Sequence, residues 1–511
     1  MISTHPSTRV AVNTFIQYVR IGITAIITLY TSRIVLANLG VENYGIYSLI
    51  GGIVTLLAFI QNDLSRTIQR YFSYYQGKGD RHMLVVIFNN SLCIQLLVSM
   101  FLCVGLILLS DVILNHLVNI PAGCLKAARW VYWLTVGSLF VNMLSIPYFA
   151  MLITHENILY SSIIQTVDAV LKIPVAISLI CISSHKLEWY SLMSFLVIGL
   201  NFCCYYVYCK RKYEECCSFS FRSFDKKFAK KMCSFMSWNN YGTACVIGRT
   251  QGTAILLNRF FGTAINAAFG ISGQVSGQIN FLSNALTTAI SPQIIKSEGA
   301  GNRLRMFRLS EISCKFSFLL TSIVAIPVVI YMPAVLGLWL EEVPEHTAMF
   351  CVAIILSNQM DLITLNLSNA SLAIGNVKTY NICINTIKIL ALPVIYHILK
   401  QGRQPIDAMI VFFIFETICT ISRLVFMHIS VKYSISQYIR NVFLGVLPTV
   451  IVNVTACFLV NRFLSSGGGL LLSGLVSLVV TCLMTYYCGL ISDERIILHN
   501  ITGKFIKQIK R

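Results

Sequence analysis

The sequence predicts an all-α integral membrane protein with about fourteen transmembrane helices, arranged as two pseudo-symmetric six-helix lobes plus two C-terminal helices. Three observations lead to this prediction. Of the 511 residues, 56% are hydrophobic and only 12% are charged, whereas an ordinary soluble domain is about 45–50% apolar and about 25% charged. The apolar residues fall into many separate runs, each long enough to cross a hydrocarbon layer of about 30 Å. An internal repeat relates the two halves of the chain.

Charged residues and turn residues separate fourteen apolar segments. In the first half of the chain these segments lie at 10–36, 43–75, 83–109, 127–153, 157–182, 187–209 and 233–258. In the second half they lie at 264–295, 308–338, 347–374, 377–399, 405–429, 437–461 and 469–491. The first segment is too long for the apolar part of a signal peptide, so we expect it to remain as a membrane span.

Lys and Arg are concentrated in the loops on the side where both chain ends are expected. The basic segment KRKYEECCSFSFRSFDKKFAKK at 210–231 carries eight of them. Because positive residues are retained in the cytoplasm during insertion, both termini are predicted to be cytoplasmic. Topology therefore accounts for the formal net charge of +19. We expect the basic segment to touch anionic membrane lipids, and we expect no nucleic-acid binding.

The repeat is visible in QGKGDR and EGAGNR, which end two apolar segments 222 residues apart. With this offset, residues 31–81 align with 253–303 without a gap, and ten positions are identical. A second match, at an offset of 219, pairs five residues within 157–175 with five within 376–394. The matching segments have the same predicted orientation, which indicates parallel repeats of six helices each.

These patterns predict the organisation of the whole chain. The N-lobe is expected at 1–209, the basic cytoplasmic connector at 210–231 and the C-lobe at 232–430, and residues 431–511 are expected to hold the last two helices and a basic cytoplasmic tail. Most of the eighteen cysteines lie in apolar runs, where cysteine behaves as a small hydrophobic residue. Their spacing matches no zinc or redox motif, so no metal site is expected.

Ionisable side chains inside membrane helices are costly, at least about 2.5–3.5 kcal/mol at the centre, so they normally face a water-filled cavity or a partner. Arg20 lies ten residues into the first segment, which is about 15 Å at 1.5 Å per residue. Arg249 and Lys388 are also deep, without an opposite charge within reach on their own helices. The full set of candidate cavity cations is Arg20, Arg249, Lys388, Arg66, Arg70 and Lys315.

Four of these cations also have a structural interpretation. Arg66 and Arg70 could extend to the headgroups, Lys315 lies near a helix end, and Arg20 could neutralise a buried acid. The buried acids are Asp168, Asp361 and Glu416, which are candidates for coupling to Na⁺ or H⁺. Asp168 alternatively neutralises Lys172, four residues later on the same helix face.

The segment FGISGQVSGQINFLSNALTT carries a second polar signal. Four amide side chains lie on this predicted helix, at Gln274, Gln278, Asn280 and Asn284. Amides and hydroxyls suit the neutral hydroxyl groups of a glycan. The alternative is interhelical hydrogen bonding with Gly and Ser packing. Buried cations beside amides indicate a substrate with an anionic group and a neutral polar part.

Three stretches carry a family resemblance: NTFIQYVRIGITAIITLYTSRIVLANLGVENYGIYSLIGGI, NRFFGTAINAAFGISGQV with the following AISPQIIKSEGAGN, and NASLAIGNVKTYN. They resemble the polysaccharide-transport branch of the multidrug/oligosaccharidyl-lipid/polysaccharide (MOP) exporter superfamily, the Wzx-type O-antigen flippases. The likeness covers essentially the whole chain as a diffuse pattern. It implies two six-helix lobes in a bacterial inner membrane, no catalytic residues, and export of undecaprenyl-pyrophosphate-linked glycan for O-antigen, lipopolysaccharide, capsule or exopolysaccharide biosynthesis.

The resemblance also implies roles and partners. Cavity cations would hold the pyrophosphate, with Arg20 matching by placement and Arg249 and Lys388 only by depth. The expected partners are the polyprenyl-linked oligosaccharide, membrane lipids, a polysaccharide polymerase and a chain-length regulator. No cofactor is expected, and because no G-x-x-x-x-G-K-[ST] motif is present, energy would come from an ion gradient, the membrane potential or removal of product.

Three other functions remain open. A multidrug cation antiporter of the same superfamily would present net negative charge to its cavity, whereas the deep charges here are net basic. A flippase for the peptidoglycan precursor, lipid II, would share the cationic cavity. A membrane-embedded polymerase or ligase usually carries a large periplasmic loop, and the longest outer loop here is 110–126.

Overall fold

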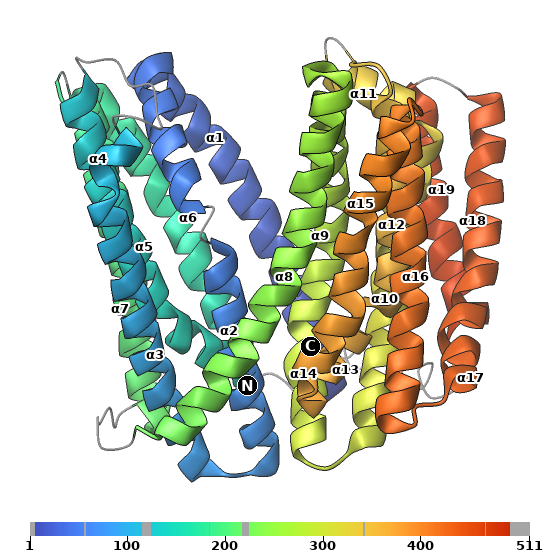
Figure 1. Ribbon diagram of the computed structural model, residues 1–511, viewed down its shortest axis with the longest axis horizontal. Coiled ribbons are helices and arrows are strands. Elements are labelled where there is room, and N and C mark those ends of the chain that lie inside the picture. Colours follow the sequence, from blue (N-terminus) through green and yellow to red (C-terminus); the bar gives the residue numbers. More distant parts are fainter. Residues whose placement is uncertain are drawn as a thin grey trace, which may run out of the picture. The chain divides into compact units, whose positions relative to one another are not determined.

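The computed structural model describes residues 6–55, 58–114, 124–182, 184–216, 224–340, 343–464 and 467–490, and every regular element in these ranges is a helix (Figure 1). The chain divides into two compact units. The N-terminal unit comprises Ala11–Asn240, and the C-terminal unit comprises Tyr241–Arg511 with Met1–Val10. The boundary lies inside one long helix, α8 (Lys226–Phe261). Since α7 continues to Lys212, both ends of the predicted connector 210–231 are helical.

The N-terminal unit packs its helices around α5. Its elements are α1 (Pro6–Thr55), α2 (Ala58–Lys78), α3 (Arg81–Leu108), α4 (Ser110–Val112), α5 (Leu125–Thr154), α6 (Ile158–Cys181), α7 (Lys186–Lys212) and the start of α8. Helix α5 contacts α2, α3, α6 and α7. Fully buried apolar side chains such as Met143 and Tyr132 make α5 the centre of this unit.

The C-terminal unit is built on α9, α10, α12 and α16. Its elements are the rest of α8, α9 (Thr263–Gly299), α10 (Arg303–Ile330), α11 (Met332–Trp339), α12 (Thr347–Leu365), α13 (Leu367–Ile374), α14 (Val377–Tyr380), α15 (Thr386–Lys400), α16 (Pro405–Val431), α17 (Ile435–Tyr438), α18 (Leu444–Phe463) and α19 (Gly467–Met484). Several predicted helices are therefore divided, because 308–338 is interrupted at Tyr331 and 347–374 at Asn366.

The last two helices pack on α10 of the C-terminal unit, at the red end of the colour scale in Figure 1. The Asn453 amide of α18 donates to the hydroxyls of Ser477 (2.9 Å) and Thr481 (3.0 Å) on α19. The Ser477 hydroxyl in turn donates to the backbone carbonyl of Ile323 on α10 (2.8 Å). These buried hydrogen bonds fix α18 and α19 to the unit, as expected for polar groups between membrane helices. The predicted basic tail after residue 490 lies outside the described residues.

Eleven helices in the described part of the chain are long and apolar enough to cross a membrane. The predicted segments 43–75, 233–258 and 264–295 are helical in their described parts but are not among these eleven, because they are more polar. They form the end of α1 with α2, most of α8, and α9. The all-helical membrane fold is confirmed, whereas the count of fourteen spans is not.

The repeat is also present in the backbone, at positions whose conformation glycine adopts without strain. Gly40 has φ 77° and ψ 164° inside α1, and Gly262 has φ 84° and ψ −172° immediately before α9. These residues are 222 apart, and both separate a first long helix from a second. A residue with a Cβ atom rarely adopts this conformation. The two glycines therefore produce the same bend between consecutive helices.

The two repeated motifs form the same turn. In QGKGDR, Gly79 has φ 77°, and the Asp80 side chain caps α3 by accepting a hydrogen bond from the backbone N–H three residues later (3.1 Å). In EGAGNR, Gly301 has φ 76°, and Asn302 caps α10 in the same way (3.0 Å). A left-handed glycine followed by an Asp or Asn cap ends one helix and begins the next.

The second match also has a backbone counterpart, at the offset of 219. Glu156 (φ 58°) corresponds to Gly375 (φ 95°), and both are left-handed. The following residues, Asn157 and Asn376, both have φ −86°, with ψ 56° and 54°. The loop between α5 and α6 therefore has the same local geometry as the loop between α13 and α14.

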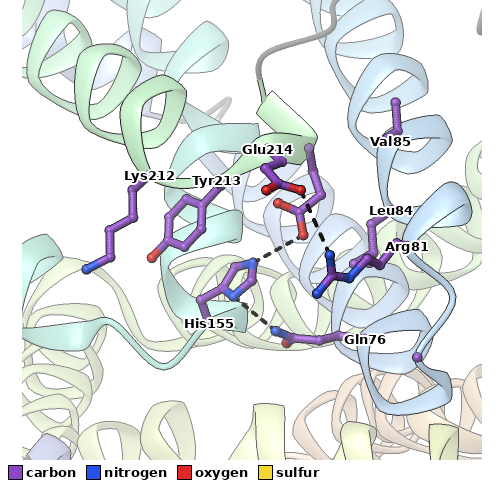
Figure 2. A pocket seen from close by; sticks show the side chains of 10 residues that line it. Gln76, Arg81, Leu84, Val85, His155, Lys212, Tyr213 and Glu214 are labelled. Carbon is purple, nitrogen blue, oxygen red and sulfur yellow. Dashed lines mark hydrogen bonds and ion pairs between the residues drawn. The ribbon is translucent and has the colours of Figure 1, made fainter.

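A pocket of about 590 Å³ opens beside the QGKGDR turn (Figure 2). The His155 ring stacks on Tyr213 with ring centroids 4.2 Å apart, and its Nδ1 lies 3.0 Å from the amide nitrogen of Gln76. Its Nε2 lies 3.8 Å from a carboxylate oxygen of Glu215. Burial raises the pKa of the Tyr213 phenol to about 12, so this side chain stays neutral in the physiological range.

Candidate functional site

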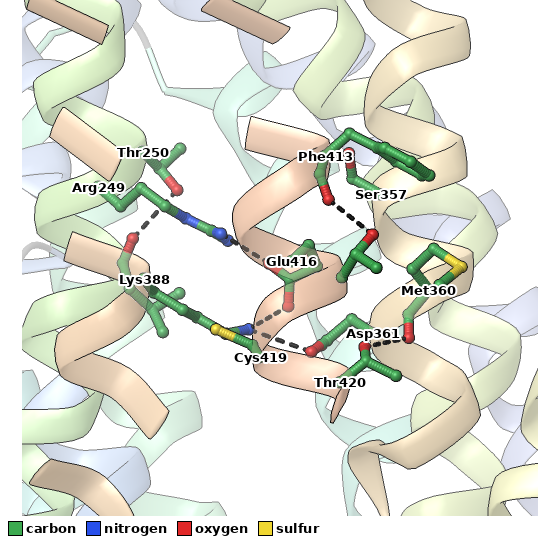
Figure 3. Close-up of polar contacts among 12 residues, drawn as sticks. Arg249, Thr250, Ser357, Met360, Asp361, Lys388, Phe413, Glu416, Cys419 and Thr420 are labelled. Atoms are coloured by element: carbon green, nitrogen blue, oxygen red, sulfur yellow. Dashed lines mark hydrogen bonds and ion pairs between the residues drawn. The ribbon is translucent and has the colours of Figure 1, made fainter. Parts of the chain in front are cut away.

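Five charged side chains form a continuous buried network in the C-terminal unit. Arg249 Nη1 lies 2.6 Å from Glu416 Oε2, and Lys388 Nζ lies 2.6 Å from Glu416 Oε1. Lys388 Nζ also lies 3.1 Å from Asp361 Oδ1, which Arg423 Nη2 approaches to 2.6 Å. Figure 3 shows Glu416 between Arg249 and Lys388, and Lys388 reaching on to Asp361. Three cations and two carboxylates give the network a formal charge of +1.

Local packing explains why residues from four helices meet here. A Cβ atom at Gly252 of α8 would lie 2.6 Å from the Leu392 side chain of α15, so the glycine allows these helices to approach closely. On α16, Glu416 and Arg423 are seven residues apart, which places them on one helix face two turns apart. The Arg249 guanidinium lies 3.8 Å from the centroid of the Phe412 ring, also on α16.

The structure gives Arg249 and Lys388 carboxylate partners from other helices. Neither has an acid within reach on its own helix, which is why the sequence predicts both as deep cations without an opposite charge. Their side chains are 6% exposed, and Glu416 is 2% exposed. Burying a charge without a partner is very costly, whereas a paired and hydrogen-bonded charge is tolerated. Asp361 and Glu416 therefore take their cationic partners from their own unit.

Arg423 belongs to this network and was absent from the predicted site residues. Its Nε donates to the Tyr380 hydroxyl (3.1 Å), and its Nη1 donates to the Asp361 carbonyl and to Thr364 Oγ1 (both 3.2 Å). The i, i+7 spacing from Glu416 was a signal that could have found it. Glu311 is a second buried charged residue that was absent from the predicted site residues. It lies on α10 and accepts hydrogen bonds from Tyr433 and from Asn441 (2.9 Å).

Arg20 in the N-terminal unit has a different environment. Its guanidinium donates to the side-chain oxygen of Gln165 on α6, and Tyr205 of α7 lies close to both. Its Nε is buried without a hydrogen-bond partner. Among the residues that the structure describes, Arg20 forms no ion pair. Arg20 is thus a partly buried cation whose hydrogen-bonding partner is a neutral amide.

Next to Gln165 lies a cavity of about 480 Å³, which we name the N-unit cavity. The Asp168–Lys172 pair lies in its wall, with Lys172 Nζ 2.7 Å from Asp168 Oδ2, so the predicted i, i+4 pair is present. The Asn201 amide donates to Asp168 Oδ1 (2.7 Å). The remaining lining comes from α2, α5, α6 and α7: Gln61, Asn62, Ser65, Asn142, Ser145, Ile146, Phe149, Ile164, Gln165, Ile198, Phe202 and Tyr205.

The other predicted cations lie in separate environments. Arg66 is largely exposed and 3.8 Å from Asp63, whereas Arg70 is buried with its guanidinium 4.7 Å from the centroid of the Tyr71 ring and 5.2 Å from that of Phe235. Arg70 thus makes cation–π contacts. Lys315 is 1% exposed, and its Nζ donates to the carbonyl of Gly489 after α19 (2.9 Å). The structure does not bring Lys315 to the buried network.

The polar residues predicted on α9 lie in two different environments. Gln274, Gln278 and Asn284 are exposed, and Asn280 is half-buried. Ser276 on the same helix accepts a hydrogen bond from Asn358 of α12. The exposed amides are available to a ligand, while the serine side of the helix serves interhelical packing. No group of three or more His, Cys, Asp or Glu residues in the described part of the chain is arranged to hold a metal ion.

Comparison with known proteins identifies the fold. No protein-family model matches the sequence, and no curated protein sequence matches it either. Solved structures do match. A crystal structure of MATE in the bent conformation aligns with a TM-score of 0.73 at 11% identity, covering 84% of this chain and 96% of that chain.

Two further solved structures agree. The outward-facing conformation of a multidrug resistance MATE family transporter of the MOP superfamily gives a TM-score of 0.69 at 12% identity, over 84% of this chain and 97% of that one. The Vibrio cholerae MATE transporter VcmN, as a mutant, gives 0.66 at 16% identity, over 83% and 98%. The chain therefore has the fold of MATE transporters of the MOP superfamily.

Proposed function

We propose that this protein is a lipid-linked oligosaccharide flippase, which moves polyprenyl-pyrophosphate-linked glycan units across the bacterial cytoplasmic membrane by alternating access. The observation that carries the proposal is Arg20, a half-buried guanidinium that forms no ion pair among the described residues and lies beside a cavity lined by amides. Such a cation suits a phosphate-bearing substrate, because guanidinium binds phosphate oxygens through two parallel hydrogen bonds.

The charge of the C-terminal network supports the same substrate class. Three cations share two carboxylates, so the buried charge is net positive. A site for organic cations would need net negative charge to offset the loss of hydration of its ligand. Within this proposal, Asp361 and Glu416 are the candidates for Na⁺ or H⁺ coupling, because protonating either carboxylate would release a cation that it now holds. The exposed amides of α9 are candidates for glycan contact.

Further roles in the proposal rest on the sequence alone. Both termini and the basic segment at 210–231 would lie in the cytoplasm. A polysaccharide polymerase and a chain-length regulator would be functional partners, and the product would serve O-antigen, capsule or exopolysaccharide biosynthesis.

The second candidate is a multidrug cation antiporter. The observation that favours it is the fold, since one of the matching structures is described as a multidrug resistance transporter. The two candidates differ in the charge that they require near Arg20. A cation site would be improved by removing Arg20, whereas a pyrophosphate site would lose its main anchor.

The test measures surface glycan in cells whose only copy of the gene encodes an Arg20 variant. Arg20→Ala should reduce surface glycan at least about tenfold, the equivalent of ~1.4 kcal/mol, at unchanged protein abundance. Arg20→Lys should restore part of the export, since lysine keeps the charge but not the planar fork. The matched control is Arg129→Ala, which removes an arginine from an exposed ion pair with Asp111 (3.1 Å).

Two outcomes would contradict the proposal. One is normal surface glycan in cells that carry Arg20→Ala. The other is gain of resistance to tetraphenylphosphonium on expression of the wild-type protein, increased further by Arg20→Ala, which would establish the antiporter instead.

A further inference from the structure

The N-unit cavity has the size and the polarity of a ligand site. Its volume of about 480 Å³ lies within the range of about 300–1,000 Å³ that is typical of small-molecule sites. Four different helices, α2, α5, α6 and α7, contribute to its wall. Three of these helices, α5, α6 and α7, are long and apolar enough to cross a membrane, and in such helices polar side chains cost free energy unless they serve packing or a water-filled path. A wall built from so many amides therefore requires a reason.

The formal charge of the described cavity wall is zero. Asp168 and Lys172 are its ionisable groups of opposite sign, and they neutralise each other at 2.7 Å. Lys172 is therefore engaged and is a poor anchor for a phosphate, and Asp168 is a poor anchor for an organic cation. Asn201 holds the second oxygen of Asp168 in place (2.7 Å). A neutral ligand is the class that gains most from such a wall.

The neutral groups supply both donors and acceptors. Gln61, Asn62, Asn142 and Asn201 line the cavity with amides, and each amide offers a carbonyl oxygen and an NH₂ group. The Asn201 side-chain oxygen is buried and has no hydrogen-bond partner among the described residues. A buried acceptor without a partner is unfavourable, so a ligand hydroxyl that donated to it would be bound tightly. Hydroxyl groups both donate and accept, which matches a surface of amides.

Aromatic rings complete the wall. Phe149 and Tyr205 lie edge to face with centroids 6.1 Å apart, and Phe202 also faces the cavity. Aromatic side chains provide a flat apolar surface beside the polar groups. A sugar ring presents the same combination, because its hydroxyls lie around the rim and its C–H groups lie on the faces.

We propose that the N-unit cavity is a subsite for one or two neutral sugar residues of the transported molecule. The inference rests on the proposed function, and it adds a place where the glycan itself is recognised, distinct from the phosphate contact at Arg20. The amides select for hydroxyl-rich ligands, and the neutralised Asp168–Lys172 pair selects against charged ones.

The experiment measures binding to the full-length protein in detergent by the shift of its melting temperature. The probes are glucose, galactose, rhamnose, N-acetylglucosamine and their disaccharides, with inorganic pyrophosphate and tetraphenylphosphonium as probes of the other two classes. At least one neutral saccharide should stabilise the wild-type protein. Asn142→Leu and Gln61→Leu should each weaken that binding about five-fold or more, since neither side chain is hydrogen-bonded to another described residue and the fold does not depend on them.

The controls separate this inference from the proposed function. Gln401→Leu removes an exposed loop amide outside the cavity and should leave saccharide binding unchanged. Arg20→Ala should lose export, while its saccharide binding should fall less than that of Asn142→Leu, because Arg20 does not itself line the cavity and donates a hydrogen bond to one residue of its wall, Gln165. If export survives in Arg20→Ala but saccharide binding depends on Asn142 and Gln61, the flippase proposal fails and the sugar subsite stands.

Two results would overturn the subsite. The first is the absence of stabilisation by every neutral saccharide up to the highest soluble concentration. The second is a shift caused by pyrophosphate or tetraphenylphosphonium that Asn142→Leu and Gln61→Leu abolish, which would assign the cavity to a charged ligand.

Discussion

The two units place the ion pairs that lie within their helices in different environments. In the C-terminal unit, Glu416 and Lys388 are 2% and 6% exposed and belong to a network that links four helices. In the N-terminal unit, the Asp168 and Lys172 side chains are 23% and 44% exposed and line an open cavity. The same repeated architecture thus carries a closed ionic core in one half and an open polar site in the other.

The difference can be followed at one repeat position. With the offset of 222, Arg20 corresponds to Gly242 in α8. A Cβ atom at Gly242 would lie 2.4 Å from Asn381 Oδ1 and 2.5 Å from Asn385 Nδ2, so in the C-terminal unit the space of a side chain is filled by two asparagines. In the N-terminal unit the same position carries a cation. We infer that packing dominates in one unit and binding in the other.

The largest expected effect is in the ionic core. Glu416→Leu should leave Arg249 and Lys388 without a shared carboxylate, and removing one partner of a buried pair costs about 3–5 kcal/mol. The melting temperature in detergent and the abundance in membranes should both fall strongly. The matched variant Asp168→Leu, in the partly exposed pair of the N-terminal unit, should cost less, about 1 kcal/mol.

A double variant tests the cause of this loss. Glu416→Leu combined with Arg249→Met removes a charge of each sign, so it should be more stable than Glu416→Leu alone. Equal loss of stability in Glu416→Leu and Asp168→Leu would show that the two charge clusters are equivalent, and the comparison between the units would fail.

The next effect concerns the paired bends. Nothing lies within 4 Å of a Cβ atom built at Gly40 or Gly262, so an alanine there would be strained only by its backbone. Because φ is 77° and 84° with an extended ψ, each Gly→Ala change should cost about 1–3 kcal/mol. Gly273→Ala is the control, since this helical glycine also faces open space and alanine there should be neutral or stabilising.

Thermal melts of the three variants decide this prediction. Comparable losses for Gly40→Ala and Gly262→Ala, with none for Gly273→Ala, would confirm that the repeat preserves a backbone conformation. A large loss for only one of the two would show that the units bend their chains for different reasons.

The repeat could be predicted from the sequence because it depends on residues that are close together in the chain. Left-handed glycines and the Asp or Asn caps that follow them depend on residues next to each other, so QGKGDR and EGAGNR predict the same turn from their residues alone. The Asp168–Lys172 pair was predictable for the same reason, because residues at i and i+4 are neighbours on one helix face. The all-helical fold followed from composition.

The partners of the deep charges could not be predicted in this way. The contact of Arg249 with Glu416 joins residues 167 positions apart, and it depends on how closely α8 approaches its neighbours. Periodicity within one helix contains no information about which helices are adjacent. The N-unit cavity was missed for the same reason, because its amides are spread over four helices and form no motif.

The smallest expected effect is at the two repeated turns, whose sequences differ at three positions, including Gln76 against Glu298. In the C-terminal unit, Glu298 pairs with Arg303 within EGAGNR. In the N-terminal unit, Gln76 stands at that position and bonds instead to His155, while Arg81 reaches Glu214 at 3.9 Å with both side chains almost fully exposed. Only the first of these two ion pairs has a largely shielded member, Glu298, whose side chain is 9% exposed.

Glu298→Gln should therefore weaken its turn by up to about 1 kcal/mol, the upper range for pairs near the surface, whereas Arg81→Gln should produce no measurable change. Hydrogen exchange at the backbone N–H groups of Gly301 and Asn302, which donate to carbonyls at 2.9 and 2.8 Å, reports the opening of the turn directly. Exchange there should accelerate in Glu298→Gln, and exchange at Gly79 and Asp80 should be unaffected by Arg81→Gln. Equal acceleration in both turns would mean that the exposed Arg81–Glu214 contact stabilises its turn as much as the partly buried pair does. The two turns would then share their energetics as well as their backbone conformation, because the pocket at His155 would compensate for the missing carboxylate at position 76.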